Sequence, residues 1–220
     1  MNDCDDGILA YPVSLNLKRK KCLVVGGGKV ACRKVETLLE FGPELITVVS
    51  PSACAELQDL FRADRAVFKQ RSYLANDLDG IFIVIVATDD PAVNAQVSQD
   101  ARSRGVLVNV ADDAGLSDFI LPSHFRRGGL IVAVSTSGRS PALARKIKEK
   151  LSLEIDETYA ELMELVSRVR CECRTTGVPI TSEGWNLALD IDNILSLLRE
   201  GKRVEAESLL KNRLTEATDS

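Results

Sequence analysis

Short apolar runs alternate with amphipathic stretches through the first half of the chain. The amphipathic stretches carry helix signals: residues 29–41 stop at Gly42-Pro43, a second stretch follows Pro51, and Asp89-Asp90-Pro91 opens a third that ends near Gly105. Alternating strands and helices are typical of a parallel sheet with right-handed crossovers. We therefore predict the α/β fold class for residues 1–113. The predicted strands are the brief apolar runs at residues 22–25, 46–49, 66–68, 81–87 and 106–109.

The pattern changes after residue 113. Two further apolar runs, 118–121 and 130–134, have no long helix between them and are predicted to be strands. A helix is expected from Pro141 to about Leu151, because Ser140 is a good N-cap and proline suits the first helical position. Beyond residue 153, apolar residues recur at helical spacing, with Gly177-Val178-Pro179 and Gly201 as dividers. We expect a short strand–helix region over 114–151 and an all-helical region over 152–220.

Three glycines join the first apolar run to the helix after it. Gly26, Gly28 and Ala31 have the G-x-G-x-x-A spacing of a dinucleotide-binding turn. The first glycine permits a tight turn, the second lets the backbone approach a pyrophosphate, and the small third residue lets the helix pack near the strand. The helix start adds unpaired N–H groups and the positive end of a dipole. This context favours nucleotide binding by a Rossmann-like sheet over the alternative, an ordinary structural turn.

Composition narrows the partners and the compartment. The chain is 45% hydrophobic and 27% charged, with a net charge of -4. These values are typical of a soluble globular protein and leave no domain-wide basic surface for nucleic acid. The longest apolar run, residues 81–87, is too short to cross a bilayer. The acidic start lacks the pattern of a signal peptide, so we expect a cytoplasmic protein without a membrane partner.

Cysteine and histidine positions do not favour a metal site. Cys171 and Cys173 form a C-x-C pair without a second pair or a nearby histidine. A plain helical location is favoured for them, and a metal or redox role is the alternative. His124 is the only histidine and is predicted to lie in a polar loop, so a surface or structural role is favoured over acid–base chemistry. We predict no metal ligands.

Ligands of an open parallel sheet bind beyond the carboxyl ends of its strands. The segments 26–31, 50–51, 87–90 and 109–113 follow predicted strands and are expected to meet there. The second strand ends at Ser50, with no Asp or Glu for ribose hydroxyls and no arginine for a 2′-phosphate. Ser50 could make a weaker contact, so the pattern leans to NAD over NADP.

Two aspartates follow the fifth predicted strand, where a nicotinamide would lie. Asp112 or Asp113 could accept a proton while a hydride leaves the substrate. Alternatively, both residues cap the turn that follows, which aspartate does well. The spacing leaves both interpretations open.

Basic residues concentrate between residues 126 and 150. Beside the hydroxyl-rich loop Ser135–Ser140 at a helix N-terminus, this local positive field could collect a substrate with many carboxylates. The alternative is a solvated helix face. Against one acid, Glu149, the segment carries Arg126, Arg127, Arg139, Arg145, Lys146, Lys148 and Lys150.

Together these features resemble the precorrin-2 dehydrogenase family of siroheme synthesis. That family includes stand-alone dehydrogenases, fungal dehydrogenase–ferrochelatases and the N-terminal half of bacterial siroheme synthase. The order and spacing of the motifs cover residues 8–151, whereas residues 152–220 match only in being helical. The matching stretches are Tyr11-Pro12-Val13, 23–34, 87–90 with Asn94, 109–112, 119–122 and 133–145.

The resemblance implies an NAD-binding Rossmann domain over 1–113, a dimerisation region over 114–151 and a helical C-terminal domain over 152–220, arranged as a homodimer. It implies oxidation of precorrin-2 to sirohydrochlorin with NAD as hydride acceptor. The carboxylate arms of that tetrapyrrole substrate would suit the basic segment. No methyltransferase domain is present, so precorrin-2 is expected to come from another protein.

The resemblance also places the catalytic aspartate on Asp112 rather than Asp113. Combined with the strand-end positions, it predicts cofactor contacts from Gly26, Gly28, Lys29, Val30, Ala31, Ser50, Pro51, Thr88, Asp89 and Asn109. Substrate contacts are expected from Ser135, Thr136, Ser137, Arg139, Ser140 and Arg145, although Ser137-Gly138 replaces the family's usual glycine pair.

Two rival functions remain. Some members of the family also insert ferrous iron, and a bifunctional dehydrogenase and sirohydrochlorin ferrochelatase needs no dedicated metal cluster. A non-catalytic nucleotide-sensing module is the rival from another class. Such modules usually keep an acidic residue at the end of the second strand, which this chain lacks.

Overall fold

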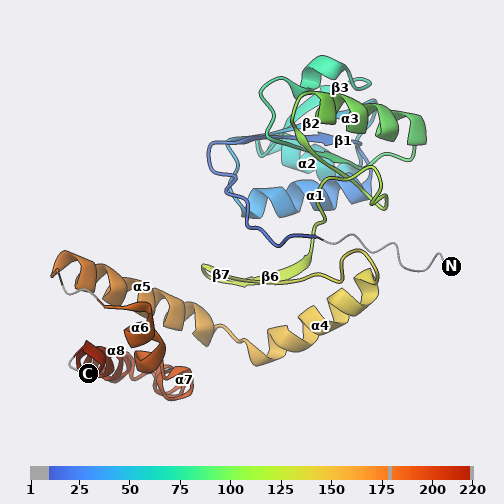
Figure 1. Cartoon of the computed structure of the whole chain (residues 1–220). Helices are drawn as coiled ribbons and strands as arrows, with labels where there is room; N and C mark the ends of the chain where they lie inside the picture. The colour runs from blue at the N-terminus through green and yellow to red at the C-terminus, as the bar shows by residue number, and fades with distance from the viewer. Residues whose placement is uncertain (1–9, 178–179, 219–220) are drawn as a thin grey trace. The chain divides into compact units, whose positions relative to one another are not determined.

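The computed structural model describes residues 10–177 and 180–218, which divide into two compact units. The first unit runs to Leu121 and also takes in Ser137–Arg139, and the second comprises Pro122–Thr136 and the chain from Ser140 onward (Figure 1). The acidic N-terminal residues and the divider Val178-Pro179 lie outside the described residues. The three-part division with boundaries at 113 and 151 stays a prediction.

The first unit is built on a sheet of five parallel strands in the order β3-β2-β1-β4-β5. In this order β2 and β3 lie on one side of β1, and β4 and β5 lie on the other. It is the strand order of a Rossmann-like sheet. The predicted α/β class and all five predicted strands are therefore confirmed. The strands are β1 (Lys21–Val25), β2 (Leu45–Ser50), β3 (Val67–Gln70), β4 (Ile83–Val86) and β5 (Leu107–Val110).

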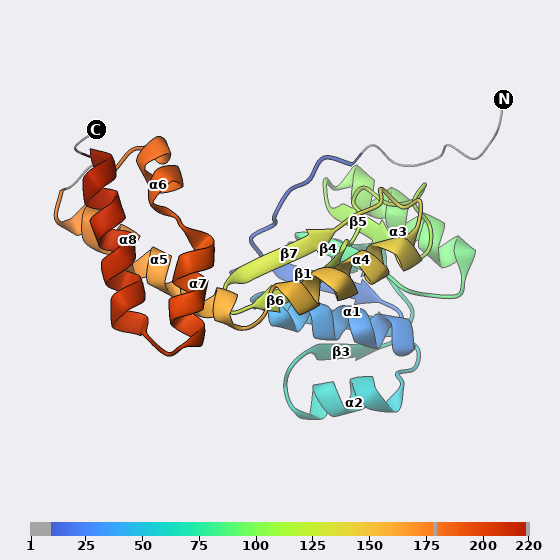
Figure 2. The ribbon, with the colours of Figure 1, turned by 90° about the horizontal axis from the view of Figure 1, so that it is seen from below.

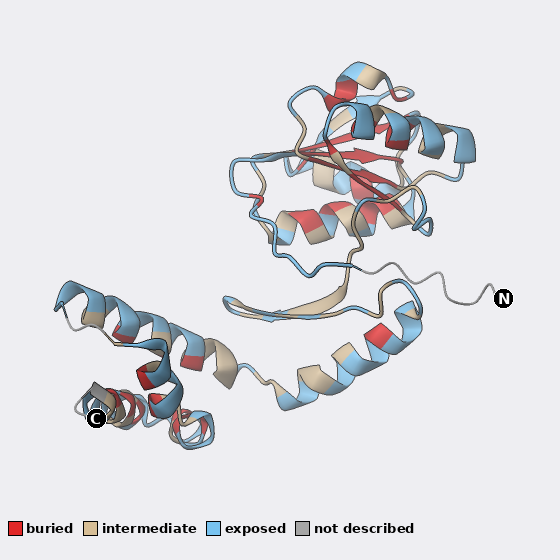
Figure 3. Cartoon of the chain, viewed as in Figure 1, coloured by how far each residue is buried: buried red, intermediate tan, exposed pale blue. Residues whose placement is uncertain are grey.

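Helices cover both faces of this sheet, because successive side chains of a strand point to opposite faces. On one face α1 (Lys29–Glu40) and α2 (Ala55–Arg62) pack against the strands, and on the other α3 (Pro91–Ser103) does so. Figure 3 shows the buried residues gathered on the strands and on the inward sides of the helices. The first core includes Val24, Val35, Val48, Leu57 and Ile85, and the second includes Leu23, Val49, Val84 and Val97.

The second unit begins with an antiparallel hairpin of β6 (Ser123–Arg127) and β7 (Leu130–Val134). The basic helix α4 (Pro141–Glu154) lies beside this hairpin (Figure 2). Ser140 caps α4 as predicted, because its hydroxyl accepts the Leu143 N–H at 3.2 Å. The remaining helices share a core of leucine, isoleucine and valine side chains. They are α5 (Thr158–Thr175), α6 (Ser182–Ala188), α7 (Ile191–Arg199) and α8 (Arg203–Thr218).

The predicted strand at 118–121 is wrong, since the strand that pairs with β7 starts after Pro122. Polar groups hold the earlier segment irregularly beside β5: the Asp118 N–H donates to Val108 O at 2.7 Å, and the Asn109 amide donates to Phe119 O at 2.9 Å. Proline has no N–H for a ladder, so regular pairing begins beyond it. His124 consequently lies in β6 rather than in a polar loop.

The C-x-C pair and the lengths of the helices bear on two further predictions. Cys171 and Cys173 lie within α5, so the predicted helical location is confirmed. Within residues 10–177 and 180–218, no helix is both long and apolar enough to cross a bilayer.

One buried carboxylate anchors the connection from β3 to β4 in the first unit. The Asp77 side chain is 1% exposed and lies in the short 3-10 helix η1 (Ala75–Leu78). It accepts hydrogen bonds from Lys69 Nζ at 2.9 Å, from the Arg71 guanidinium at 2.6 Å and from the Leu74 N–H at 3.1 Å. Burial alone raises the pKa of Asp77, but the hydrogen bonds from Arg71, Lys69 and Leu74 outweigh it and hold the pKa below its ordinary value.

Replacing Asp77 should therefore produce a pH-dependent loss of stability. We expect Asp77→Asn to lower the free energy of unfolding by about 2 kcal/mol at pH 7, because two cations lose their charged partner. The folded pKa is depressed, so the wild-type advantage is present above the unfolded pKa of about 4 and disappears as pH falls through the folded pKa. Urea unfolding at pH 7 and at pH 3 measures the difference.

Asp79→Asn is the matched control, since Asp79 is exposed and pairs with Arg104 at the surface. A surface pair of this kind contributes less than about 1 kcal/mol. Equal losses in the two variants, or a loss in Asp77→Asn that does not shrink at low pH, would contradict the assignment.

Candidate functional site

Three glycines follow β1, and the first is required by both conformation and space. Gly26 has a backbone φ of +126°, a value that residues with a Cβ rarely adopt. A Cβ at Gly26 would lie 2.1 Å from the carbonyl oxygen of Ala87. The Gly26 N–H donates to Val49 O at 3.0 Å. The turn after β1 is thus in close contact with the ends of β2 and β4.

Gly27 is a residue that the spacing rule did not single out. A Cβ there would lie 1.8 Å from the carbonyl oxygen of Ser52 and 2.8 Å from Ser50 Oγ. The Gly27 carbonyl accepts the Cys54 N–H at 2.8 Å. Its role is therefore to let the loop after β2 lie directly against the glycine turn. The signal was present in the sequence as a third consecutive glycine.

Gly28 differs from Gly26 and Gly27, because among the described residues no atom beyond its chain neighbours lies within 4 Å of the position that its Cβ would take. Its φ of -84° is open to any residue, and it is exposed. Ala31, one turn into α1, is fully buried in the core beneath. A side chain at Gly28 would fill only open space in front of the helix, where the dinucleotide rule expects a pyrophosphate to approach.

The start of α1 is suited to an anion. Among the described residues no side chain caps this helix at Gly28, and its first turn contains no acidic residue. The N–H groups of Lys29, Val30 and Ala31 belong to that first turn, where the helix leaves donors unpaired and concentrates positive potential. A pyrophosphate is the kind of group that such a turn binds.

The loops after β2 and β4 border the same turn. Ser50 is buried, with its hydroxyl against Gly27, and Pro51 is exposed. Thr88 Oγ1 lies 2.6 Å from Asn94 Oδ1, and the Asn94 amide donates back to Thr88 O at 3.2 Å. Asp89 is exposed in this loop. The structure thus brings the predicted residues after β1, β2 and β4 to one end of the sheet.

Asn109 and the two aspartates follow on β5 and beyond it. The buried Asn109 uses its amide to hold Phe119 O. Asp113 Oδ1 accepts the Leu116 N–H at 3.0 Å, so Asp113 is a turn-forming residue. Asp112 is exposed, with φ +61°, and its carboxylate accepts no hydrogen bond from any residue that the structure describes. Aspartate adopts this left-handed conformation more readily than most residues do.

A lysine that the sequence analysis did not select lies near Asp112. Lys34 projects from α1 and is half-buried. Burial and, to a smaller degree, the neighbouring Arg33 lower its pKa, whereas the negative charge of Asp112 works in the opposite direction. The pair puts both a carboxylate and a cation at the end of β5.

The predicted substrate residues fall in both units. In the first unit, Ser137 has φ +54° beside Gly138 at φ +82°. In the second unit, Thr136 Oγ1 accepts the Ser140 N–H at 3.1 Å, and this contact fixes the entry to α4. Ser135 precedes that contact, Arg139 belongs to the first unit, and Arg145 is exposed on α4.

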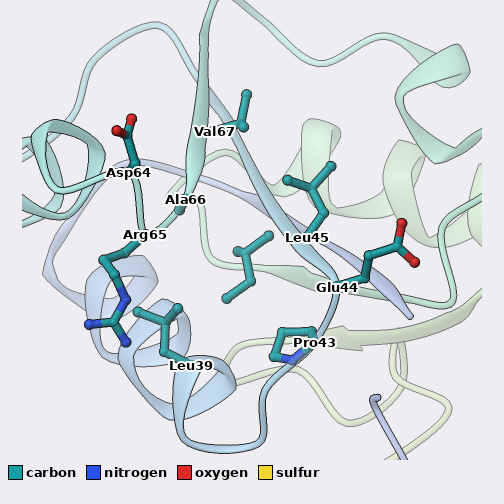
Figure 4. A pocket seen from close by; sticks show the side chains of 9 residues that line it. Leu39, Pro43, Glu44, Leu45, Asp64, Arg65, Ala66 and Val67 are labelled. Atoms are coloured by element: carbon teal, nitrogen blue, oxygen red, sulfur yellow. The ribbon is translucent and has the colours of Figure 1, made fainter. Parts of the chain in front are cut away.

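A small hollow of about 100 Å³ lies elsewhere in the first unit. Figure 4 shows its lining of Leu39, Pro43, Glu44 and Arg65 near the amino ends of β2 and β3. Ligands of parallel sheets bind at the carboxyl ends. This hollow is therefore not the candidate cofactor site. In the described part of the chain, no group of three or more His, Cys, Asp or Glu side chains could hold a metal ion.

Comparisons with known proteins match both units. A family model described as "Putative NAD(P)-binding" matches residues 13–123, and one described as "Sirohaem biosynthesis protein central" matches residues 127–152. The chain is 38% identical over 202 residues to a siroheme synthase of Nitrosococcus oceani, covering 91% of this chain and 43% of that protein. It is 36% identical over 208 residues to one from Photorhabdus laumondii, covering 94% and 44%.

The chain thus spans less than half the length of these curated relatives. A solved structure of similar length is "SirC, precorrin-2 dehydrogenase", with 28% identity and a TM-score of 0.63. The match covers 96% of this chain and 100% of that one.

Gly28 and Gly27 should respond differently to the same substitution. We expect Gly28→Ala to cost about 1 kcal/mol of stability, the cost of alanine at an N-cap. It should nevertheless weaken nucleotide binding at least tenfold, about 1.4 kcal/mol, because the methyl group occupies the approach to the helix start. Thermal unfolding and calorimetric titration with NAD measure the two effects separately.

Gly27→Ala is the companion variant. It should lower the free energy of unfolding by about 3 kcal/mol, since its methyl group meets backbone atoms that cannot move aside. A stable Gly27→Ala protein, or a Gly28→Ala protein with unchanged affinity for NAD, would contradict these roles.

Proposed function

This chain belongs to the family described as "Putative NAD(P)-binding", and we propose that it oxidises precorrin-2 to sirohydrochlorin with NAD as hydride acceptor. The segment that follows matches the model described as "Sirohaem biosynthesis protein central". The observation that carries the proposal is the open, uncapped start of α1 behind Gly28. That start lies in a chain whose likeness to a precorrin-2 dehydrogenase extends over 96% of its length. The reaction removes one hydride and one proton from the macrocycle.

The residues of the glycine turn fit the cofactor. We assign the pyrophosphate to Gly26, Gly28, Lys29, Val30 and Ala31, because the missing Cβ of Gly28 leaves the first N–H groups of α1 accessible. The loops that carry Ser50, Pro51, Thr88 and Asp89 border this turn, and Asn109 shapes the end of β5. When bound, the nicotinamide supplies the acceptor for the hydride.

NAD rather than NADP is the proposed cofactor. The end of β2 offers no arginine for a 2′-phosphate, and the Ser50 side chain is buried against Gly27. A 2′-phosphate therefore finds no cationic partner from this strand end.

Asp112 is the proposed catalytic residue, as general base or as the group that orients the macrocycle. Its exposed carboxylate is available to a substrate, whereas that of Asp113 is occupied by the Leu116 N–H. The half-buried Lys34 places a positive charge near this carboxylate. We assign the carboxylates of the tetrapyrrole to Ser135, Thr136, Ser137, Arg139, Ser140 and Arg145.

Removing the Asp112 carboxylate tests this assignment. We expect Asp112→Ala to lower turnover of precorrin-2 at least 100-fold, a typical contribution of general base catalysis. NAD should still bind within about twofold of wild type, because the glycine turn is untouched. Absorbance of NADH reports turnover, and calorimetry reports binding.

Asp113→Asn is the matched control for this measurement. It removes the neighbouring charge but retains an oxygen that can accept the Leu116 N–H. The control should keep most of the activity. Normal turnover by Asp112→Ala would remove Asp112 from the mechanism, and absent turnover by the wild-type protein would reject the proposed reaction.

We further propose that residues 114–151 mediate a homodimer. In the part of the chain that the structure describes, the hairpin β6–β7 is a two-stranded sheet with no further strand at either edge, and such a sheet needs a partner surface for stability. Leu143 and Ile147 lie one turn apart on α4 and expose their side chains, as does Ile131 on β7. Exposed large apolar side chains on both elements of this region favour association.

Charging this surface should dissociate the dimer. We expect the wild-type chain to show twice the mass of one chain in light scattering, and the double variant Leu143→Asp/Ile147→Asp to show the mass of a single chain, since buried carboxylates would be left without partners. Val204→Asp, at an exposed apolar residue of α8, is the control and should leave the mass unchanged. A monomeric wild type, or a dimeric double variant, would contradict the proposal.

A further inference from the structure

The end of β2 lacks the acidic residue that usually recognises the ribose in this fold. The loop that leads from β2 into α2 is held against this turn at two points. The Cys54 N–H donates to Gly27 O at 2.8 Å, and the absent Cβ of Gly27 makes room for the Ser52 carbonyl. Because Cys54 is the N-cap of α2, the first turn of α2 follows directly from this contact.

Glu56 is the acidic residue of that first turn, and it is exposed. Its own N–H, the adjacent Cys54 thiol and, less strongly, the Lys29 ammonium hold the pKa of its carboxyl below the usual value. Lys29 is the first residue of α1. A carboxylate that is ionised at neutral pH therefore lies within electrostatic range of the cation nearest the pyrophosphate turn.

We propose that Glu56 determines the choice between NAD and NADP, in place of the acidic residue that this fold usually carries at the end of its second strand. The proposal rests on the proposed function, since it concerns the same cofactor. In dinucleotide-binding folds the ribose lies near the end of the second strand, beside the glycine turn. Glu56 offers acceptor oxygens to the ribose hydroxyls and repels a 2′-phosphate at that position.

Lys29 also contributes to the proposed choice between NAD and NADP. An unpaired lysine at the mouth of the turn would attract the additional phosphate of NADP. The negative charge of Glu56 lies within electrostatic range and opposes this attraction. Removal of Glu56 should therefore act in two ways: it abolishes the repulsion, and it leaves the attraction between Lys29 and the phosphate unopposed.

A structural alternative makes a different prediction. An acidic residue in the first turn of a helix stabilises that helix through its dipole, and such a role changes stability without changing the preference between two nucleotides. The ratio of the dissociation constants for NADP and NAD separates the two roles.

The experiment is a direct titration of the full chain with NAD and with NADP, without tetrapyrrole. We expect Glu56→Gln to lower the ratio of the NADP to the NAD dissociation constant by about tenfold, which corresponds to about 1.4 kcal/mol. Adding Lys29→Gln to this variant should remove most of the gain in NADP affinity. Low ionic strength enlarges both effects, because exposed charges are screened by salt.

Asp59→Asn is the matched control. Asp59 lies on the same helix, is exposed, and pairs with Arg62 at 2.7 Å. The substitution changes the net charge as Glu56→Gln does but should leave the ratio unaltered. An unchanged ratio in Glu56→Gln, or the same change in both variants, would overturn the assignment of Glu56 while NAD binding by the wild type still stands. A wild-type chain that binds neither nucleotide would overturn both the assignment and the proposed cofactor.

Discussion

Close backbone contact at the glycine turn is the constraint on which the rest of the first unit depends. Gly26 lies against the Ala87 carbonyl and Gly27 against that of Ser52, at distances that no Cβ could occupy. These contacts bring the loops after β1, β2 and β4 together at one end of the sheet. Gly28 is left with open space in front of it, so the start of α1 remains accessible. A single run of three glycines therefore produces both the rigid base and the open front of the site.

Charged residues lie on two sides of this turn, at the end of β5 and near the end of β2. At the end of β5, Asp112 is exposed in a left-handed conformation, with Lys34 as its nearby cation. Near the end of β2, Glu56 lies within electrostatic range of Lys29. In our proposals the first pair serves proton transfer and the second selects the nucleotide. Separating the two roles allows cofactor preference to change without altering the chemistry of the macrocycle.

The alternation of apolar runs predicted the sheet well because a strand buried on both faces must be continuously apolar. The same criterion failed at residues 118–121, an apolar run that lies irregularly beside β5. There Asp118 and Asn109 form hydrogen bonds that replace a regular ladder. Periodicity does not reveal which backbone groups side chains will satisfy. The strand that does form, β6, contains His124 and two arginines. It has no alternation of apolar residues from which a strand could have been predicted.

From the sequence alone, the glycine spacing, the strand–helix order and the family resemblance could be recognised, since each depends on neighbours along the chain. Only the folded structure revealed that Gly27 and Gly28 have separate roles. It also showed that Asp112 is exposed, whereas Asp113 accepts a backbone hydrogen bond. The proximity of Glu56 to Lys29 and of Lys34 to Asp112 likewise required the folded structure. These properties depend on the contacts of residues remote in sequence. A linear pattern specifies which residue types are available, whereas packing determines which of their polar groups remain accessible and which charges interact.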